Sequence, residues 1–314
     1  MQKKYLSLFA LGGLLLAAAA GGTWAYWTQE LEAVNEFQIG KYDTTLIEEF
    51  TPPGPGEWMP GVEVEKAVQV RNDGTIDQAV ISHIHHCWIR EEDVLDGQGN
   101  PVPPAKGERY ALTFPVSSKD LGEENPGGEE PKKYEYAALI QWGDTAAMPS
   151  VEHVAKELGI EQTVSGIEDP RADGKWILID AKEDAYGYSD LYFLYAGIVP
   201  GSETEKKEST SLLLKAVTMN PKLNATVTEK YQRAGWDAKT GTATYSNYTV
   251  VNPKYGYDSS RYTMDIEAVS VQATASALRE VWKGRPGMTE ELCEAFISAF
   301  EGQLIPEYVD ASKQ

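Results

Sequence analysis

Residues 63–89, EVEKAVQVRNDGTIDQAVISHIHHCWI, carry the pattern that decides the fold. In the runs before Asn72 and after Ile76, β-branched residues recur at short spacing, which is typical of half-buried β-strands. Between the runs stands Asn72-Asp73-Gly74, a strong turn signal. The stretch therefore predicts two strands joined by this turn, either as a hairpin or as strands of two different sheets.

The rest of the chain has the same character, with short strands separated by polar, Gly/Pro-rich segments. Residues 91–133 are loop-like, because such a composition buries too little apolar surface to order itself firmly. A short helix is expected over 151–158, and a C-terminal amphipathic helix with Leu292, Phe296 and Phe300 on one face is expected after Thr289. Further strands are expected at 176–179, 191–195, 211–218 and 262–275. Many short strands and few helices predict an all-β fold, an antiparallel β-sandwich with loop insertions.

The N-terminal 25 residues have the three parts of a secretory signal peptide. Lys3 and Lys4 supply the positive charge, residues 6–20 form an apolar run, and small residues stand at Thr23 and Ala25. The run is about 15 residues long, shorter than the roughly 20 that span a bilayer core. An uncleaved N-terminal anchor is the alternative. We expect cleavage between Ala25 and Tyr26, a secreted mature protein and contact with the membrane only during export.

The charge of the chain excludes several partners. Its 28 basic and 48 acidic residues give a formal charge of −20, which becomes −22 when residues 1–25, with two lysines and no acids, are removed. Such a charge argues against nucleic acid or an anionic membrane surface as the main partner. The two cysteines, Cys87 and Cys293, could pair in an exported protein, while Cys293 also fits a small buried position in a helix.

One cluster, His83-Ile84-His85-His86-Cys87, invites a chemical interpretation. In an extended strand His83, His85 and Cys87 point to one face, where two imidazoles two residues apart can share a metal ion. A complete site would need a fourth ligand and supporting hydrogen bonds. The alternative is a set of ordinary surface and core residues. We therefore predict no catalytic residue and no cofactor, and keep these three residues as the metal candidates.

Aromatic residues crowd two regions and allow two interpretations. Carbohydrate-binding sandwiches use such residues as stacking platforms, whereas core and cross-strand packing use them more often. The first group follows residue 185 and the second lies near residue 250. Their members are Tyr186, Tyr188, Tyr192, Phe193 and Tyr195, and then Tyr245, Tyr248, Tyr255 and Tyr257.

Several blocks resemble a known family. Residues 21–28, GGTWAYWT, look like the export junction that SipW-type signal peptidases recognise on the TasA/camelysin group of biofilm matrix proteins of Gram-positive bacteria. Residues 35–40 (NEFQIG) with the strand up to Phe50, and 58–61 (WMPG) with the strand to Asn72, resemble the first half of that group. Residues 196–201 (AGIVPG), 212–218 and 262–272 resemble its second half, closest to the BsaA-like clostridial branch. The resemblance covers roughly 1–90 and 175–280.

The resemblance implies a jelly-roll sandwich and a secreted structural subunit of extracellular biofilm matrix fibres. It also implies self-association, association with other matrix components and processing by a SipW-type peptidase. The insertions at 91–133 and 225–260 and the C-terminal helix depart from the compact family pattern, which leaves a major or an accessory fibre role open. Part of the family carries a metallopeptidase label, but the helical motif of two histidines four apart with an adjacent Glu is absent, since Glu152-His153 stands alone. We therefore expect no enzyme. The alternatives are a camelysin-type cell-surface metallopeptidase and a carbohydrate- or peptide-binding adhesin.

A fibre needs a way to satisfy an open strand edge of each subunit. Residues 26–50 are the candidate donor strand, with Leu31, Val34, Phe37 and Ile39 as the assembly side chains, unless this segment completes its own sheet. The expected organisation is a signal peptide (1–25), this N-terminal segment (26–50), a β-sandwich domain with insertions (51–284), and a C-terminal helix and tail (285–314).

Overall fold

The computed structural model describes most of the chain after residue 40. The described residues are 41–51, 53, 57–93, 101, 104–110, 113–115, 134–184, 187–223, 227–237, 242–252 and 260–307. Side chains are described for these residues except 113–115, 134, 184, 227–237 and 242–252.

Strands make up most of the described structure. They are β1 (Thr44–Phe50), β2 (Glu63–Asn72), β3 (Gln78–Arg90), β4 (Arg109–Tyr110), β5 (Thr113–Pro115), β6 (Tyr134–Tyr136), β7 (Ala138–Trp142), β8 (Thr145–Ala147), β9 (Trp176–Asp184), β10 (Gly187–Tyr195), β11 (Glu208–Ser209), β12 (Leu214–Met219), β13 (Val227–Asp237), β14 (Thr242–Asn252) and β15 (Ser260–Gln272). The helices are α2 (Glu152–Glu157), α3 (Ala275–Val281) and α4 (Glu290–Ala299), with short 3₁₀ turns at Pro149–Val151 and Glu301–Gln303.

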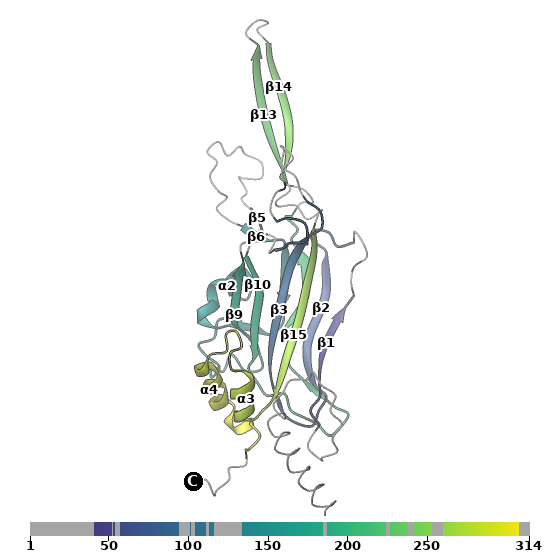
Figure 1. Ribbon diagram of the computed structural model, residues 1–314. Helices are drawn as coiled ribbons and strands as arrows, with labels where there is room; N and C mark the ends of the chain where they lie inside the picture. Colours follow the sequence, from purple (N-terminus) through teal and green to yellow (C-terminus); the bar gives the residue numbers. More distant parts are fainter. Residues whose placement is uncertain are drawn as a thin grey trace, which may run out of the picture.

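Two sheets pack face to face, which confirms the predicted all-β sandwich (Figure 1). The first sheet has the order β1-β2-β12-β7, with β11 also paired to β2. The second has the order β15-β3-β10-β9-β8, with β4 also paired to β3. The pairs are antiparallel except for β8 and β9, which are parallel.

The Asn72–Gly74 turn joins the two sheets, because β2 lies in the first sheet and β3 in the second. The Asn72 side chain donates hydrogen bonds to Ile76 O at 2.8 Å and Val199 O at 3.0 Å. Gly74 packs so closely on the segment before β1 that a Cβ there would lie 2.2 Å from Lys41 O. Of the two arrangements that the sequence allowed, the structure has strands of different sheets.

The side chains between the two sheets are most completely buried in the middle strands. Val68 of β2, Ile84 of β3, Leu191 of β10 and Leu214 of β12 are at most 1 % exposed. These side chains alternate with outward-facing ones, as the two-residue period of a strand requires. The prediction of half-buried strands in this part of the sequence is therefore confirmed for both sheets.

The β7–β9 side of the sandwich, here called the sealed side, is covered by residues 148–172. This segment contains α2, which was expected from the sequence and lies beside β9 (Figure 1). Val154, Leu158 and Ile160 are buried in the core between the sheets. Trp142 Nε1 donates a hydrogen bond to Leu158 O at 2.7 Å and so ties the segment to the edge of the first sheet.

The outer face of the second sheet is covered over part of its length by α3 and α4 (Figure 1). The predicted C-terminal helix is α4, and its N-cap is Thr289, whose side chain accepts from Leu292 N at 3.1 Å. Trp282 and Phe296 meet edge to face with ring centroids 4.9 Å apart. Helix α3 was not expected, because its residues follow directly on the alternating strand pattern.

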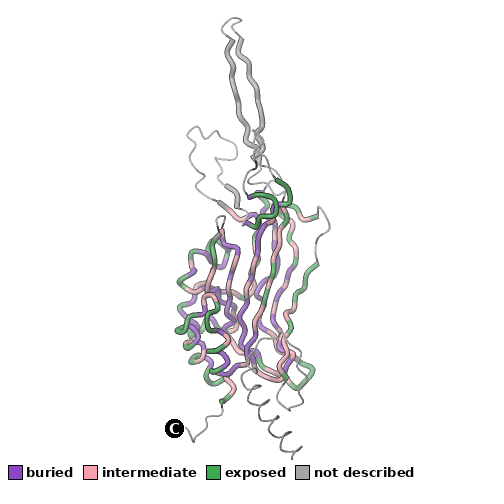
Figure 2. The backbone as a smooth tube through the Cα atoms, viewed as in Figure 1, coloured by how far each residue is buried: buried purple, intermediate pink, exposed green. Residues whose placement is uncertain are grey.

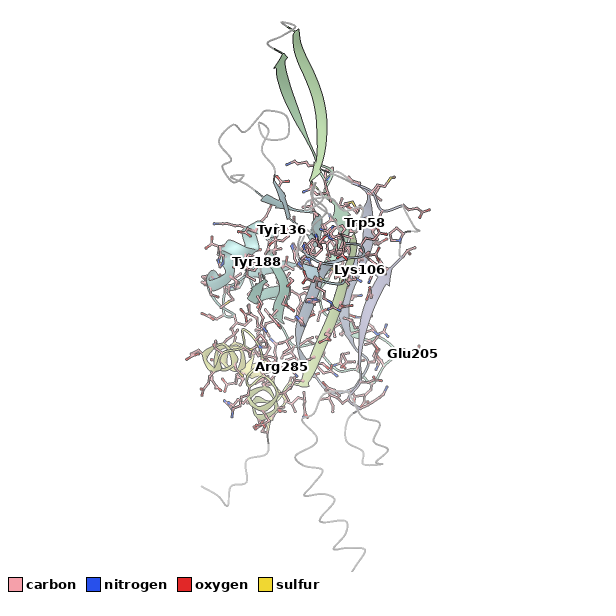
Figure 3. The ribbon with its side chains drawn as sticks, turned by 45° about the horizontal axis from the view of Figure 1, so that its top comes forward. Trp58, Lys106, Tyr136, Tyr188, Glu205 and Arg285 are labelled. Carbon is pink, nitrogen blue, oxygen red and sulfur yellow. The ribbon has the colours of Figure 1, made fainter. Side chains whose placement is uncertain are left out.

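The insertion at 225–260 holds a hairpin of β13 and β14, paired through eleven residue pairs. Figure 1 shows this hairpin extending beyond one end of the sandwich, here called the hairpin end, where β3 ends and β15 begins. Trp58 lies toward that end, and Glu205 lies toward the opposite end (Figure 3). That opposite end, here called the turn end, carries the Asn72–Gly74 turn.

Candidate functional site

The side of the sandwich opposite the sealed side is bounded by β1 of the first sheet and β15 of the second, each the outermost strand of its sheet. We call it the open side. Leu46 of β1 and Met264, Ile266 and Ala268 of β15 pack on the core but are only half-buried. Ile84, the residue that pairs with Ile266 on the neighbouring strand, is 0 % exposed. Figure 2 shows the buried residues concentrated in the central strands, with intermediate and exposed residues along β1 and β15.

At the turn end, hydroxyl groups join β15 to β1 and to the residues just before it. Ser270 Oγ lies 2.7 Å from Tyr42 Oη and 2.8 Å from Thr44 Oγ1. Thr44 also donates to Gln78 Oε1 at 2.6 Å. Burial raises the pKa of Tyr42 to about 12, against the opposing effect of its hydrogen bonds with Ser270 and Thr44.

Toward the hairpin end, the open side carries an ion pair beside an exposed ring. Lys66, on the core-facing side of β2, is 7 % exposed and pairs with Glu48, whose side chain is 35 % exposed. The Lys66 ammonium lies 4.5 Å from the centroid of the Phe50 ring, which is 44 % exposed. Lysine is rarely buried unless it is paired, and on the open side Glu48 is the partner that accompanies the burial of Lys66.

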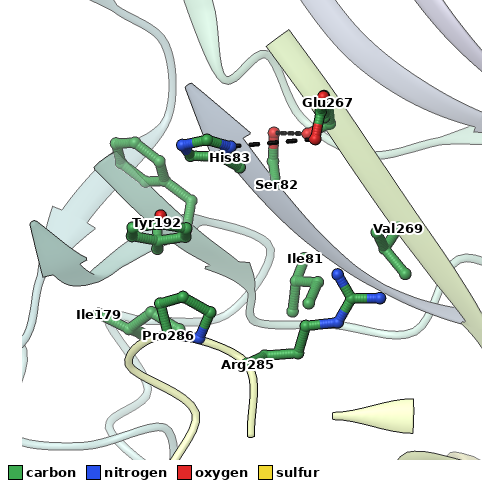
Figure 4. Close-up of a pocket in the computed structure, with 10 residues that line it drawn as sticks. Ile81, Ser82, His83, Ile179, Tyr192, Glu267, Val269, Arg285 and Pro286 are labelled. Atoms are coloured by element: carbon green, nitrogen blue, oxygen red, sulfur yellow. Dashed lines mark hydrogen bonds and ion pairs between the residues drawn. The ribbon is translucent and has the colours of Figure 1, made fainter. Parts of the chain in front are cut away.

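The histidine cluster lies on the outer face of the second sheet. Asp190 Oδ1 accepts hydrogen bonds from His83 Nε2 at 2.7 Å and His85 Nδ1 at 3.0 Å. His85 Nε2 lies 3.3 Å from Arg109 Nη1, and His83 Nδ1 lies 3.9 Å from Glu267 Oε2 (Figure 4 shows the His83–Glu267 contact). Burial raises the pKa of Asp190, but the two histidine hydrogen bonds outweigh it and hold that pKa below its usual value.

These contacts bring together two of the three metal candidates. Cys87 Sγ lies 3.4 Å from Thr263 Oγ1, while the histidine nitrogens turn to Asp190. Among the residues that the structure describes, no group of three or more His, Cys, Asp or Glu side chains is arranged to hold a metal ion. The cluster, as it stands, is a hydrogen-bonded tie between β3 and β10.

The first aromatic group is engaged in packing where it is described. The Tyr192 ring stacks on His83 with centroids 4.5 Å apart, and the Lys182 ammonium lies 5.1 Å from its centroid. Tyr188 and Tyr195 are buried. Tyr186 and the side chains of the second aromatic group lie outside the described part of the chain. The described tyrosines therefore favour packing over an open stacking platform.

The two cysteines lie in different regions, Cys87 in β3 and Cys293 in the packing of α4, and both are buried without a disulfide between them. Burial raises the pKa of the Cys293 thiol. None of the helices in the described ranges is long and apolar enough to cross a membrane.

The predicted cleavage junction and assembly side chains lie outside the described residues. They are Ala25, Tyr26, Leu31, Val34, Phe37 and Ile39. Within the predicted donor 26–50, residues Thr44–Phe50 pair with β2 of their own chain over their whole length. Residues 26–40 of that segment lie outside the described part of the chain, which begins with Lys41 at the turn end, where Lys41 O accepts from Thr75 N at 2.7 Å.

Sequence reasoning missed the ion pair on the open side, although Lys66 stood in a core-facing position of an alternating strand. No protein-family model matches the chain, and no curated protein matches it in sequence. The open side is the feature of the described structure that most needs a functional explanation.

Proposed function

We propose that the mature chain is a secreted structural subunit that polymerises into extracellular matrix fibres by donating a strand to the next subunit. The observation that carries the proposal is the open side. There, two outermost strands, β1 and β15, flank half-buried apolar side chains. An outermost strand presents unpaired N–H and C=O groups, which pair readily with an added strand. Such addition gains affinity from backbone hydrogen bonds and specificity from alternate side chains.

The position and length of residues 26–40 suit a donor. Lys41 lies at the turn end, so residues 26–40 lead away from that end. Fifteen extended residues reach about 50 Å, and β15, with 13 residues, is about 43 Å long. Hydroxyl groups of β15 and of the segment through β1 already bond to one another at the turn end, so the proposal has the donor enter from the other end. A donor leaving the turn end of one subunit therefore enters the hairpin end of the next, a head-to-tail contact that produces an open filament.

The energetics of such a contact are favourable. Leu31, Phe37 and Ile39 would each contribute about 1.5–3 kcal/mol when buried in the neighbour. Because interactions between exposed charges are individually weak, we expect this gain to outweigh the repulsion between subunits of formal charge −22. Because salt shortens the reach of that repulsion, higher salt is expected to speed polymerisation.

The proposal includes a jelly-roll relationship for the sandwich. Eight strands of five or more residues form the two sheets, β1, β2, β3, β7, β9, β10, β12 and β15. Within the three-strand sets β2-β12-β7 and β15-β3-β10, the strands lie side by side in the order found in a jelly roll. In a jelly roll the first strand lies beside the last and the fifth beside the fourth. Here β1 and β9 instead join the opposite sheets, so we describe the sandwich as a jelly roll with two exchanged outer strands.

The proposal also includes the export of the chain and its membership of a protein family. Cleavage between Ala25 and Tyr26 would free the donor segment only after export, which would keep subunits from polymerising inside the cell. The resemblance in 1–90 and 175–280 supports membership of the TasA/camelysin group, with a SipW-type peptidase and other matrix components as partners. N-terminal sequencing of the exported protein checks the junction, and a start more than a few residues from Tyr26 would contradict it.

A deletion of residues 26–40 from the mature chain tests the function. We expect fibres to disappear in electron micrographs while the thermal melting temperature stays that of the parent monomer. If both fibres and fold are lost, the segment belongs to its own subunit's sheet. If fibres persist unchanged, the segment plays no part in assembly and the proposal fails.

A further inference from the structure

We propose that a groove on the outer face of the second sheet binds a primary ammonium group carried on a short alkyl chain. This is the chemistry of a lysine side chain and of a small alkylamine. The ammonium is held between His83 and Glu267, and the alkyl chain lies in the apolar cavity beside them. The inference is independent of the proposed strand donation and uses the face of the sheet that is turned away from the core.

The groove has an apolar part and a charged part. The apolar part is a cavity of about 80 Å³ under the turn between α3 and α4 (Figure 4). Apolar side chains provide most of its lining, namely Ile81, Ile179, Tyr192, Val269 and Pro286. The charged part is a hollow of about 280 Å³, and its lining also includes His83 and Glu267, which border the apolar cavity. A ligand that has a charged head and an apolar chain can therefore occupy both parts at once.

The hydrogen bonds of His83 leave one of its nitrogens facing another acceptor. Because the Asp190 carboxylate accepts, the 2.7 Å bond between them is donated by His83 Nε2. In the neutral imidazole the other nitrogen, Nδ1, is then an acceptor. It lies 3.9 Å from Glu267 Oε2, which also accepts. Two acceptors that face each other at this distance form a site for a group that donates hydrogen bonds to both.

His85 shows the same arrangement with its donor in place. His85 Nδ1 donates to Asp190 at 3.0 Å, and His85 Nε2 accepts from Arg109 Nη1 at 3.3 Å, since a guanidinium can only donate. Within the described part of the chain, no lysine or arginine takes this position at His83 Nδ1, whose charged neighbour there is Glu267. A ligand ammonium would supply to His83 the cationic donor that Arg109 supplies to His85.

The charges of the groove favour a cation and orient it. The charged hollow has three carboxylates, of Asp190, Asp265 and Glu267, against the single guanidinium of Arg109. Arg285 lines the apolar cavity at the other end from Glu267 (Figure 4), so it repels an ammonium there. The Glu267 side chain is 80 % exposed, so its attraction for the ammonium is screened by water. Burial of the alkyl chain adds the rest of the affinity.

The experiment titrates the monomeric mature chain with n-butylamine and follows the ring nitrogens of its four histidines by NMR. At about pH 8 the amine is protonated, as a lysine side chain is. We expect a saturable shift of His83 Nδ1 with a dissociation constant on the order of 1 mM, and no shift of His153 on exposed α2. n-Butanol lacks the ammonium and ammonium chloride lacks the chain, so each is expected to bind at least about tenfold more weakly.

A capped lysine, Nα-acetyl-lysine amide, distinguishes the two sources of the ligand. Binding as tight as that of n-butylamine would assign the site to a lysine side chain of a partner protein. Binding of n-butylamine alone would assign it to small free amines. A groove that recognises neither, with no saturable shift at His83, would overturn the proposal.

Matched variants separate the site from the overall negative charge of the chain. Glu267→Gln keeps the shape of the side chain and is expected to weaken n-butylamine binding on the order of tenfold. Glu280→Gln removes the same charge from an exposed position of α3 and is expected to leave binding unchanged. Equal effects of the two variants, or ammonium chloride binding as well as n-butylamine, would mean unspecific attraction of cations and would overturn the site. Because these measurements use the monomer, their failure would leave the proposed strand donation standing.

Discussion

The sealed and open sides of the sandwich differ in how far the chain covers the outermost strands of the two sheets. On the sealed side, residues 148–172 of the same chain cover the edge strands of both sheets. Trp142 of β7 is hydrogen-bonded to this covering segment. On the open side, Tyr42, Thr44 and Ser270 meet at the turn end, while Leu46, Met264, Ile266 and Ala268 stay half-buried. Under the proposed function, the open side is kept for an intermolecular contact.

The largest effect is expected on the sealed side. Trp142 is 8 % exposed and donates through its indole N–H to Leu158 O. Trp142→Ala is expected to lower the free energy of unfolding by about 3–5 kcal/mol, because it leaves a cavity and an unpaired carbonyl. Denaturant unfolding measures the loss. Trp58→Ala, in a half-buried residue at the hairpin end, is the matched change and is expected to cost less.

The second prediction tests whether water is excluded from the interior as far as β3, the strand next to the open side. His86, the partner of Met264 across β3 and β15, is 3 % exposed, and burial lowers its pKa to about 4. The unfolded chain, with an ordinary histidine pKa near 6.5, takes up the proton first. Stability is therefore expected to fall by about 3 kcal/mol as pH drops from about 6.5 to about 4, and this contribution to level off below that.

Unfolding curves at several pH values measure the slope of the free energy of unfolding against pH. His86→Leu is expected to flatten the slope in this pH range, whereas His153→Gln, in an exposed residue of α2, is expected to leave it in place. An unchanged slope in His86→Leu would mean that water reaches this histidine, and that the open side is wetter than the structure indicates.

The smallest effect on monomer stability is expected at the open side itself. Ile84 and Ile266 are neighbours across β3 and β15, the first fully buried and the second half-buried. Ile84→Ala is expected to cost about 2–5 kcal/mol of monomer stability and Ile266→Ala about 1 kcal/mol. Fibre elongation is expected to fall markedly in Ile266→Ala despite its stable monomer. Equal losses of stability in the two variants would remove the distinction between core and open side.

Much of this architecture follows from local sequence. The alternation in 63–70 and 262–271 and the cap at Thr289 predicted strands and a helix where they occur, because these elements are specified by residues close together in the chain. The joining of two sheets at Asn72–Gly74 could not be decided from the sequence, since the same turn chemistry serves a hairpin. It depends on contacts with Lys41 and Val199, which are distant in sequence.

The candidate site was less accessible to sequence reasoning. His83 and His85 lie on one face as expected, but their partner Asp190 comes from a strand about a hundred residues later. Lysine is rarely buried unless it is paired, and the burial of Lys66 depends on Glu48 of a neighbouring strand, which the local sequence does not identify as its partner. The open side exists only once β1 and β15 are known to be the outermost strands on the same side.

Hydrogen–deuterium exchange of monomer and fibre tests the central claim most directly. A donated strand would protect backbone amides along the outer edge of β15, of β1 or of both, while the sealed side would be unaffected. The account predicts slower exchange in residues 260–268 or 44–50 on polymerisation, and unchanged exchange in residues 138–160. Slower exchange confined to the sealed side, or fibres whose β1 and β15 exchange as fast as in the monomer, would contradict it.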